Sequence, residues 1–176
     1  YNLRTPRVIL AIILGAGLAS AGAAFQSLFS NPLATPDTLG VTSGASVGAV
    51  IGLLLGRDMI TVQLMALVFG VAAVTLTVLA ARIRGQTSTV TLILSGVIIS
   101  ALLNAVLSGV KLIADPNSQL QTITFWLMGS LAGASFDNLA IGSWLIVAGV
   151  VILFLLRWRL NLMTPSEDEI RAAGIR

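Results

Sequence analysis

The sequence predicts an all-α membrane protein with five transmembrane helices and short helices outside the membrane. Hydrophobic residues make up 56% of the chain and charged residues only 10%. Several apolar stretches approach or exceed the roughly 20 residues with which a helix crosses a bilayer. These stretches are too long for the roughly 10-residue strands of a membrane barrel, and lipid tolerates no irregular backbone. Helices are therefore the spanning elements that fit this composition.

The expected spans follow one another closely within a single transmembrane domain that covers residues 1–176. The first span carries no charged side chain, the second is short, and the last is followed by two arginines. We place the five spans at residues 8–29, 39–56, 59–81, 90–110 and 139–156.

An odd number of spans places the two ends of the chain on opposite sides of the membrane. The loops on the side of the amino end hold four basic residues, and those on the other side hold six. Because cytoplasmic loops are enriched in lysine and arginine, we expect the carboxyl end in the cytoplasm and the amino end outside. The chain opens with Tyr1 and shows no signal-peptide cleavage pattern, which favours an origin inside a longer protein.

Missing residue types exclude several classes of function. The chain contains no cysteine and no histidine, so disulfides and the commonest metal ligands are absent, and no metal or cofactor is expected. Residues 44–48 match the G-x-S-x-G motif of serine hydrolases, but that motif needs a histidine base. There is no phosphate-binding loop, so nucleotide chemistry belongs to another chain and this one is not an enzyme. The small basic excess lies in loops, where it favours membrane topology over nucleic-acid binding.

The five expected spans contain no ionisable residue. A charged side chain inside a membrane is costly unless function requires it, so such residues mark proton and ion pathways. Their absence disfavours an ion-coupled secondary transporter. That class stays open as an alternative, as does a structural or regulatory membrane module without transport. Energy for any pumping must come from a partner.

Small residues recur at helical spacing in the first two spans. Since GxxxG steps let helix backbones approach closely in lipid, we expect both spans to use these stripes for packing, and to pack on each other. The stripe of the second span is Gly40, Gly44, Gly48, Gly52 and Gly56, and that of the first is Ala11, Gly15, Ala19 and Ala23.

A short helix is predicted at residues 165–173, after the last span. Thr164 and Glu167 form a capping box around Pro165, and acidic residues continue through the first turn. One interpretation is a solvated surface helix. The other is a cytoplasmic contact for a soluble motor protein, formed by Glu167, Asp168, Glu169, Arg171 and Gly174.

Several blocks of the sequence together resemble a known family. The chain is similar over its whole length to the permease subunit of type II ABC importers for iron-siderophores, haem and cobalamin, the FecCD/BtuC-like family. The blocks that carry the resemblance are Arg4-Thr5-Pro6-Arg7, Asn31-Pro32-Leu33-Ala34, Pro36-Asp37, Leu39-Gly40-Val41, Ser43-Gly44-Ala45, Leu94-Ser95-Gly96 and Trp126-Leu127-Met128-Gly129-Ser130. Permeases of this family have ten helices and about twice this length, so the chain would correspond to the second through sixth.

The resemblance implies specific partners. They are a second permease subunit, cytoplasmic ABC ATPase subunits, and a periplasmic or lipid-anchored substrate-binding protein, all at a bacterial inner membrane. Arg4 and Arg7 would dock the binding protein, although the alternative is that they only anchor the first span at the lipid headgroups. The helix at 165–173 would contact the ATPase.

The resemblance also implies a cytoplasmic gate at the turn after the first span. Asn31 and Leu33 would close the translocation path there, with Thr89 at the entry of the fourth span as a further gate position. Pro32 and Pro36 would fix the turn, and Asp37 or Thr38 would cap the next helix. The alternative is a merely tight connection between two helices.

Overall fold

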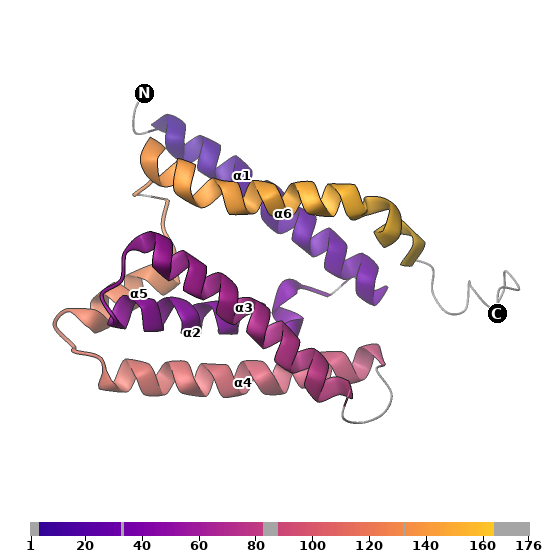
Figure 1. Ribbon diagram of the computed structural model, residues 1–176, viewed down its shortest axis with the longest axis horizontal. Coiled ribbons are helices and arrows are strands. Elements are labelled where there is room, and N and C mark those ends of the chain that lie inside the picture. Colours follow the sequence, from indigo (N-terminus) through magenta and orange to yellow (C-terminus); the bar gives the residue numbers. More distant parts are fainter. Residues whose placement is uncertain (1–3, 33, 83–87, 132, 164–176) are drawn as a thin grey trace, which may run out of the picture. The chain divides into compact units, whose positions relative to one another are not determined.

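The computed structural model describes residues 4–32, 34–82, 88–131 and 133–163 (Figure 1). These residues form helices joined by turns and contain no β-strand, which confirms the predicted all-α fold class. In chain order the elements are α1 (Arg4–Phe29), the 3₁₀ helix η1 (Pro36–Leu39), α2 (Val41–Leu54), α3 (Met59–Arg82), α4 (Thr89–Ile113), α5 (Gln119–Met128) and α6 (Phe136–Met163).

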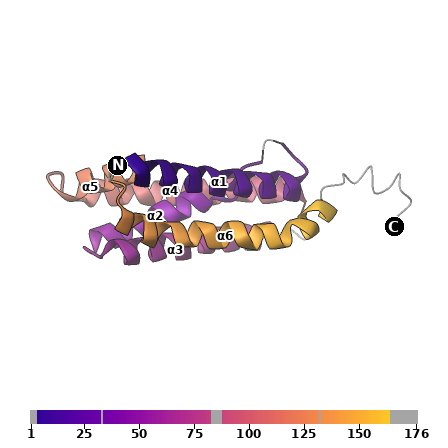
Figure 2. The same cartoon turned by 90° about the horizontal axis from the view of Figure 1, so that it is seen from above.

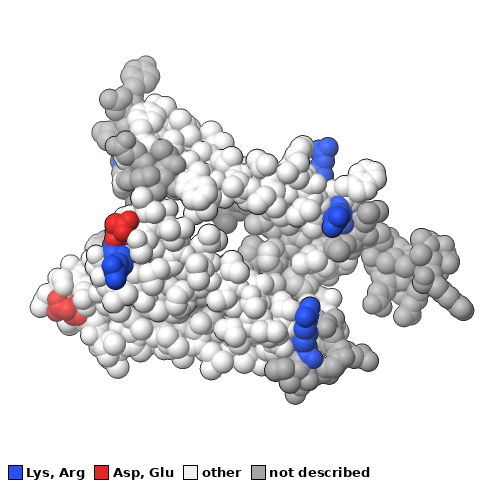
Figure 3. Space-filling view, viewed as in Figure 1, with Lys and Arg blue, Asp and Glu red and all other residues white. Residues whose placement is uncertain are grey.

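Four helices are long and apolar enough to cross a membrane: α1, α3, α4 and the part of α6 from Gly142 to Asn161. The second expected span is shorter. With 14 residues, α2 extends about 21 Å, which is less than the roughly 30 Å of bilayer hydrocarbon. On the face shown in Figure 3, the charged atoms of the described residues lie near helix ends, and the surface between them is uncharged.

The chain divides into two compact units. The first unit comprises residues 1–35 and 131–176, and its described part is built on α1 and α6. These two helices come from opposite ends of the chain, yet they lie side by side and run in the same direction (Figures 1 and 2). At their contact, a Cβ atom added to Gly17 would lie 2.6 Å from Cγ2 of Ile146, so the missing side chain of this glycine lets the helices approach.

The second unit comprises residues 36–130, and its centre is the antiparallel pair of α2 and α3. Three glycines of α2 face α3 at four-residue intervals. A Cβ atom added to Gly44 would lie 2.6 Å from the Phe69 carbonyl oxygen, and one added to Gly48 would lie 2.8 Å from Cβ of Phe69. At Gly52 the nearest atom, Cγ2 of Val62, is 3.1 Å away. The two backbones therefore touch along most of α2.

A short helix that the sequence patterns did not predict closes one end of the second unit. Ile123 of α5 is fully buried, and it packs with Val50 of α2 and Ala114, which follows α4. Asp115 anchors the start of this helix, because the hydroxyl of Ser118 donates a hydrogen bond to its carboxylate. The connection from α4 therefore folds back on α2 as an ordered cap.

Two glycines of the predicted stripe do not belong to α2. Gly40 precedes the helix with φ of 78°, and Gly56 follows it with φ of 62°; both angles lie in the left-handed region that glycine adopts without a Cβ clash. No atom lies within 4 Å of a Cβ added to Gly56, so this residue ends the helix and makes no packing contact. The expectation of helix packing by all five glycines is wrong for Gly56.

The predicted cap of the second span is also wrong. Asp37 and Thr38 lie within η1, and Gly40 precedes α2 without a side-chain cap hydrogen bond. The chain turns through the left-handed conformation of Gly40, so neither side chain stands at the N-cap position. The expected packing between the first two spans would join one unit to the other, and it stays a prediction.

Candidate docking, gate and coupling sites

The two arginines expected to dock a binding protein lie in the first turn of α1. Both Arg4 and Arg7 are exposed, whereas Pro6 between them is fully buried. Proline is tolerated here because the first four N–H groups of a helix have no partner within the helix. The interaction of a basic residue with the helix dipole at a helix N-terminus is unfavourable by about 0.3–1 kcal/mol. No acidic residue lies in this turn to offset it. The stability of α1 therefore gives no reason for two arginines at this place.

The turn after α1 is closed by backbone hydrogen bonds. The amide of Asn31 donates to the Gln26 carbonyl at 3.1 Å, and the amide of Ser30 donates to the Ser27 carbonyl at 3.3 Å. This is the Schellman arrangement, with Ser30 at φ of 47° in the place that glycine usually takes. Ala34, 2% exposed, donates back to the Asn31 carbonyl at 3.1 Å. These backbone hydrogen bonds hold the described residues on both sides of Leu33.

The three expected gate residues differ in their exposure and in whether the structure describes them. Asn31 is half-buried within the hydrogen-bonded turn, and Leu33 lies outside the described residues. Thr89 is the exposed first residue of α4, directly after Ser88, whose hydroxyl accepts a hydrogen bond from the Thr91 amide at 3.2 Å. Asn31 belongs to the first unit and Thr89 to the second, so their meeting at one gate stays a prediction.

The expected ATPase contact at Glu167, Asp168, Glu169, Arg171 and Gly174 lies outside the described residues, as does the helix predicted at 165–173. The described part of α6 ends at Met163.

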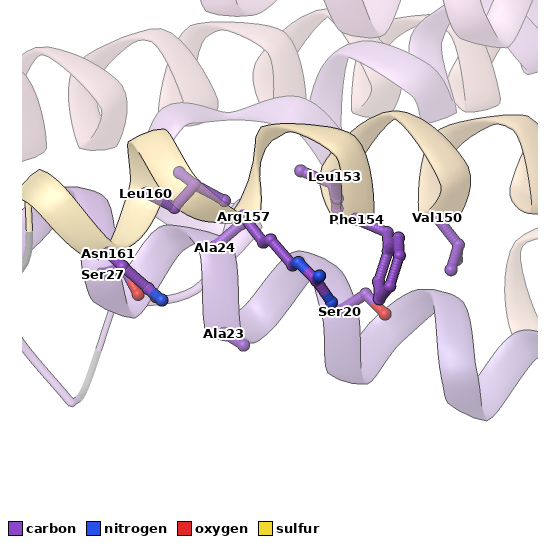
Figure 4. A pocket seen from close by; sticks show the side chains of 10 residues that line it. All are labelled: Ser20, Ala23, Ala24, Ser27, Val150, Leu153, Phe154, Arg157, Leu160 and Asn161. Atoms are coloured by element: carbon purple, nitrogen blue, oxygen red, sulfur yellow. The ribbon is translucent and has the colours of Figure 1, made fainter.

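A groove between α1 and α6 was not predicted from the sequence. It has a volume of about 240 Å³, and its lining combines apolar side chains with Ser20, Ser27, Arg157 and Asn161 (Figure 4). The guanidinium carbon of Arg157 lies 4.2 Å from the centroid of the Phe154 ring. The Ser20 hydroxyl donates to the Ala16 carbonyl at 2.7 Å, within its own helix. The only sequence signal is the spacing of Phe154 and Arg157, which places them on one helix face.

Among the residues that the structure describes, no group of three or more histidine, cysteine, aspartate or glutamate side chains could hold a metal ion. The described helices also keep their charged residues near their ends.

Comparison with known proteins gives these features a family. The chain matches the FecCD transport family over residues 1–176. It is 35% identical over 176 residues to the molybdate import system permease protein MolB of Haemophilus influenzae, which covers 100% of this chain and 52% of that protein. It is 38% identical over 175 residues to a probable iron chelatin transport system permease protein of Helicobacter pylori, with 99% and 52% covered.

Further relatives agree with this assignment. The vitamin B12 import system permease protein BtuC of Serratia proteamaculans is 33% identical over 180 residues. A solved structure described as an inward-facing conformation of a metal-chelate type ABC transporter superposes with a TM-score of 0.83 at 34% identity, covering 99% of this chain and 56% of that one. The chain spans about half the length of the relatives it matches. The resemblance seen in the sequence motifs is confirmed, and the chain belongs to the FecCD transport family.

Proposed function

We propose that the chain forms half of the membrane permease of a binding-protein-dependent ABC importer, which moves cargo into the cytoplasm with energy from ATP hydrolysed on a separate subunit. The match to the FecCD transport family over residues 1–176 carries this proposal. The described helices support it, because none of them holds a charged residue near its middle, a feature typical of ion-coupled transporters.

The proposed cargo is an iron-siderophore, haem or cobalamin. The names of the iron chelatin and vitamin B12 relatives favour this class. Molybdate is the second candidate, because the MolB relative is 35% identical over 176 residues. The charged side chains of the described helices lie toward the helix ends, so we assign the choice of cargo to the soluble binding protein.

The proposed assembly contains a second permease subunit, cytoplasmic ATPase subunits, and a periplasmic or lipid-anchored binding protein, in the inner membrane of a bacterium. The amino end of this chain would lie outside and the carboxyl end in the cytoplasm. Arg4 and Arg7 would dock acidic side chains of the binding protein, because both residues are exposed and lie on one helix turn. The segment 165–173 would contact the ATPase.

The turn at residues 30–35 would act as the cytoplasmic gate. Its support is the local hydrogen bonding of Ser30, Asn31 and Ala34, together with a loop sequence that has no charged residue to retain cargo. Leu33 and Thr89 would complete the gate.

The decisive experiment uses the full-length permease that contains this chain, reconstituted with its ATPase in liposomes. Uptake would be measured with ferric siderophore, haem, cobalamin and molybdate, each with its binding protein, with and without ATP. We expect uptake of one cargo class that requires both ATP and the binding protein. Uptake driven by a proton or sodium gradient without ATP would show an ion-coupled transporter. A membrane protein that binds no ATPase and moves none of the cargoes would overturn the proposal.

The docking role has its own test. The double variant Arg4→Glu with Arg7→Glu should slow association with the binding protein, most strongly at low salt, because charge pairs at an interface mainly steer the encounter. Reversal of the facing acidic residues on the binding protein should restore part of the rate. Wild-type association kinetics at low salt would leave the two arginines as lipid anchors only.

A further inference from the structure

The 3₁₀ helix η1 lies directly after the turn proposed as the gate, and it is held inside the second unit. It contacts α2, α3 and α4. Leu39 at its end is 6% exposed, and Gly40 after it is also buried. A helix of four residues has few internal hydrogen bonds, so it needs contacts with other elements to keep one position. Two such contacts are described below.

The first contact is a hydrogen bond from α3. Thr77 is the one polar side chain among the described residues that is fully buried, and its hydroxyl donates to the Leu39 carbonyl at 3.0 Å. Several other hydroxyls bond within their own helix: Thr75 donates to the Val71 carbonyl at 2.9 Å, and Ser108 to the Asn104 carbonyl at 2.9 Å. The Thr77 bond instead joins residues 38 positions apart. A buried carbonyl left without a donor is costly, so this bond resists separation of η1 from α3.

The second contact is made by the backbone of α4. A Cβ atom added to Gly96 would overlap the Thr38 carbonyl oxygen and would lie 3.0 Å from Cα of Leu39. On the other side of the contact, a Cβ atom added to Gly40 would lie 3.0 Å from the Ser100 hydroxyl oxygen. At Gly96 backbone meets backbone, so no side chain lies at this point to absorb relative movement of η1 and α4.

We infer that Thr77 and Gly96 are positioning residues that fasten η1 to α3 and α4, so that the carboxyl end of the turn at 30–35 moves together with these two helices. The fastening itself stands on the contacts of η1, and only its role in gating rests on the proposed function. Movement of α4 during transport would then pull on the gate through Thr38 and Leu39, because Pro36 follows Thr35 without an intervening linker.

The fastening is tested by a spin label on Asp37, an exposed residue of η1. The chain contains no cysteine, so Asp37→Cys adds a single labelling site here once any cysteines elsewhere in the full-length permease are replaced by serine. In the reconstituted permease with its ATPase, the label should be nearly as immobile as one placed by Val97→Cys on α4. It should be much less mobile than one placed by Arg57→Cys in the loop between α2 and α3. A label at position 37 as mobile as that in the loop would overturn the inference, even if no further variant folds.

Two variants with matched controls locate the contacts. Thr77→Val keeps the shape of the side chain and removes the hydrogen-bond donor, and Gly96→Ala adds a Cβ atom for which there is no space. Each variant should make the spin label at position 37 more mobile, which narrows its resonance line. Thr77→Ser keeps the hydroxyl and should restore the wild-type line. Thr75→Val and Gly109→Ala are the controls, because the Thr75 hydroxyl bonds within α3 and no atom lies within 4 Å of a Cβ added to Gly109. Unchanged spectra in both Thr77→Val and Gly96→Ala would overturn the inference.

A leak measurement separates this inference from the gate proposal. Cargo efflux without ATP from loaded liposomes should rise several-fold in Thr77→Val and return to the wild-type level in Thr77→Ser. A mobile Asp37 label without added leak would support the fastening and contradict the gate at residues 30–35. Added leak with an immobile label would contradict the fastening and leave the gate in place.

Discussion

The two units of the chain pack their helices in different ways. In the α2–α3 pair, three glycines in succession bring the backbones into contact, and 22% of the most apolar window of α3 is buried. In the α1–α6 pair, one glycine approaches a side chain, a groove of about 240 Å³ separates the helices further along, and no residue of either apolar window is buried. Apolar helices therefore pack most tightly where small residues face the partner.

The two units also differ in how the chain connects their helices. The helices of the second unit follow one another in the chain, and α2 passes into α3 through a short loop that ends at Asp58. In the first unit, the whole second unit separates α1 from α6 in sequence. Short loops and close backbones together give the second unit the stronger internal constraint, which is where η1 is anchored.

The largest effect is expected from Gly48→Ala in the second unit. The added Cβ atom would overlap the Met65 carbonyl oxygen and lie 2.8 Å from Cβ of Phe69, and backbone cannot move aside as a side chain does. We expect a loss of about 2 kcal/mol or more in unfolding free energy, within the usual range for an overpacked core. Thermal unfolding of the full-length permease in detergent, followed by tryptophan fluorescence, measures the loss as a lower midpoint.

The matched control for this variant is Gly109→Ala in α4, where an added Cβ atom meets nothing within 4 Å. Alanine is favoured over glycine in a helix by about 1 kcal/mol, so the control should unfold at the wild-type temperature or slightly above it. Equal midpoints for the two variants would show that close backbone contact does not hold the second unit together.

A smaller effect is expected from Gly17→Ala in the first unit. Its added Cβ atom would lie 2.6 Å from a single methyl carbon of Ile146, and a side chain can shift by a few tenths of an ångström. The loss should be about 1 kcal/mol, close to the lower end of the cost of overpacking. Combining Gly17→Ala with Ile146→Ala removes that methyl group, so the double variant should lose less than the sum of the two single variants.

This pair of variants tests the comparison itself. If Gly17→Ala lowers the unfolding midpoint as much as Gly48→Ala does, the two units are equally constrained and the contrast drawn from their contacts is wrong.

Hydrophobic pattern and glycine spacing were sufficient to predict the fold class and which face of α2 packs. They did not identify the partner of that face, because Gly44, Gly48 and Gly52 would fit against any helix with small or yielding residues. Strict four-residue spacing also failed to separate helix interior from helix ends, and Gly56 shows why. Its role depends on a positive φ, which a spacing pattern does not contain.

The site residues divide in a similar way. The roles of Arg4 and Arg7 and of the gate turn were proposed from the resemblance of their sequence blocks to those of the permease family, and both roles stay predictions. Thr77 was not found, since a threonine inside a long apolar helix looks like its neighbour Thr75. Only the fold shows that the Thr77 hydroxyl meets the Leu39 carbonyl, whereas that of Thr75 bonds within its own helix.

The groove of the first unit supplies a weaker test. Arg157→Gln removes the cation over the Phe154 ring, an interaction of about 0.5–1 kcal/mol when exposed to solvent. The unfolding midpoint should fall slightly, and Arg159→Gln, which changes the charge equally on the same helix, should leave it unchanged. An equal fall in both variants would mean that the total charge at this end of α6 matters and the ring contact does not.

The smallest effect concerns pH and the loop between α2 and α3. The Thr61 hydroxyl donates to the Asp58 carboxylate at 2.6 Å, and this hydrogen bond, followed by that from the Thr61 amide, lowers the pKa of Asp58 below its ordinary value. Because the pKa is lower in the folded state, the ionised carboxylate stabilises the fold above the unfolded pKa of about 3.9, and this contribution is lost as pH falls through the folded value. Asp58→Asn keeps a side-chain acceptor but does not titrate. At pH 7 the unfolding midpoint of the wild type should therefore be slightly higher than that of Asp58→Asn. This difference in midpoint should disappear as pH falls below about 4. A difference in midpoint that stays constant over this pH range would mean that the shape of the Asp58 side chain stabilises the second unit and its charge does not.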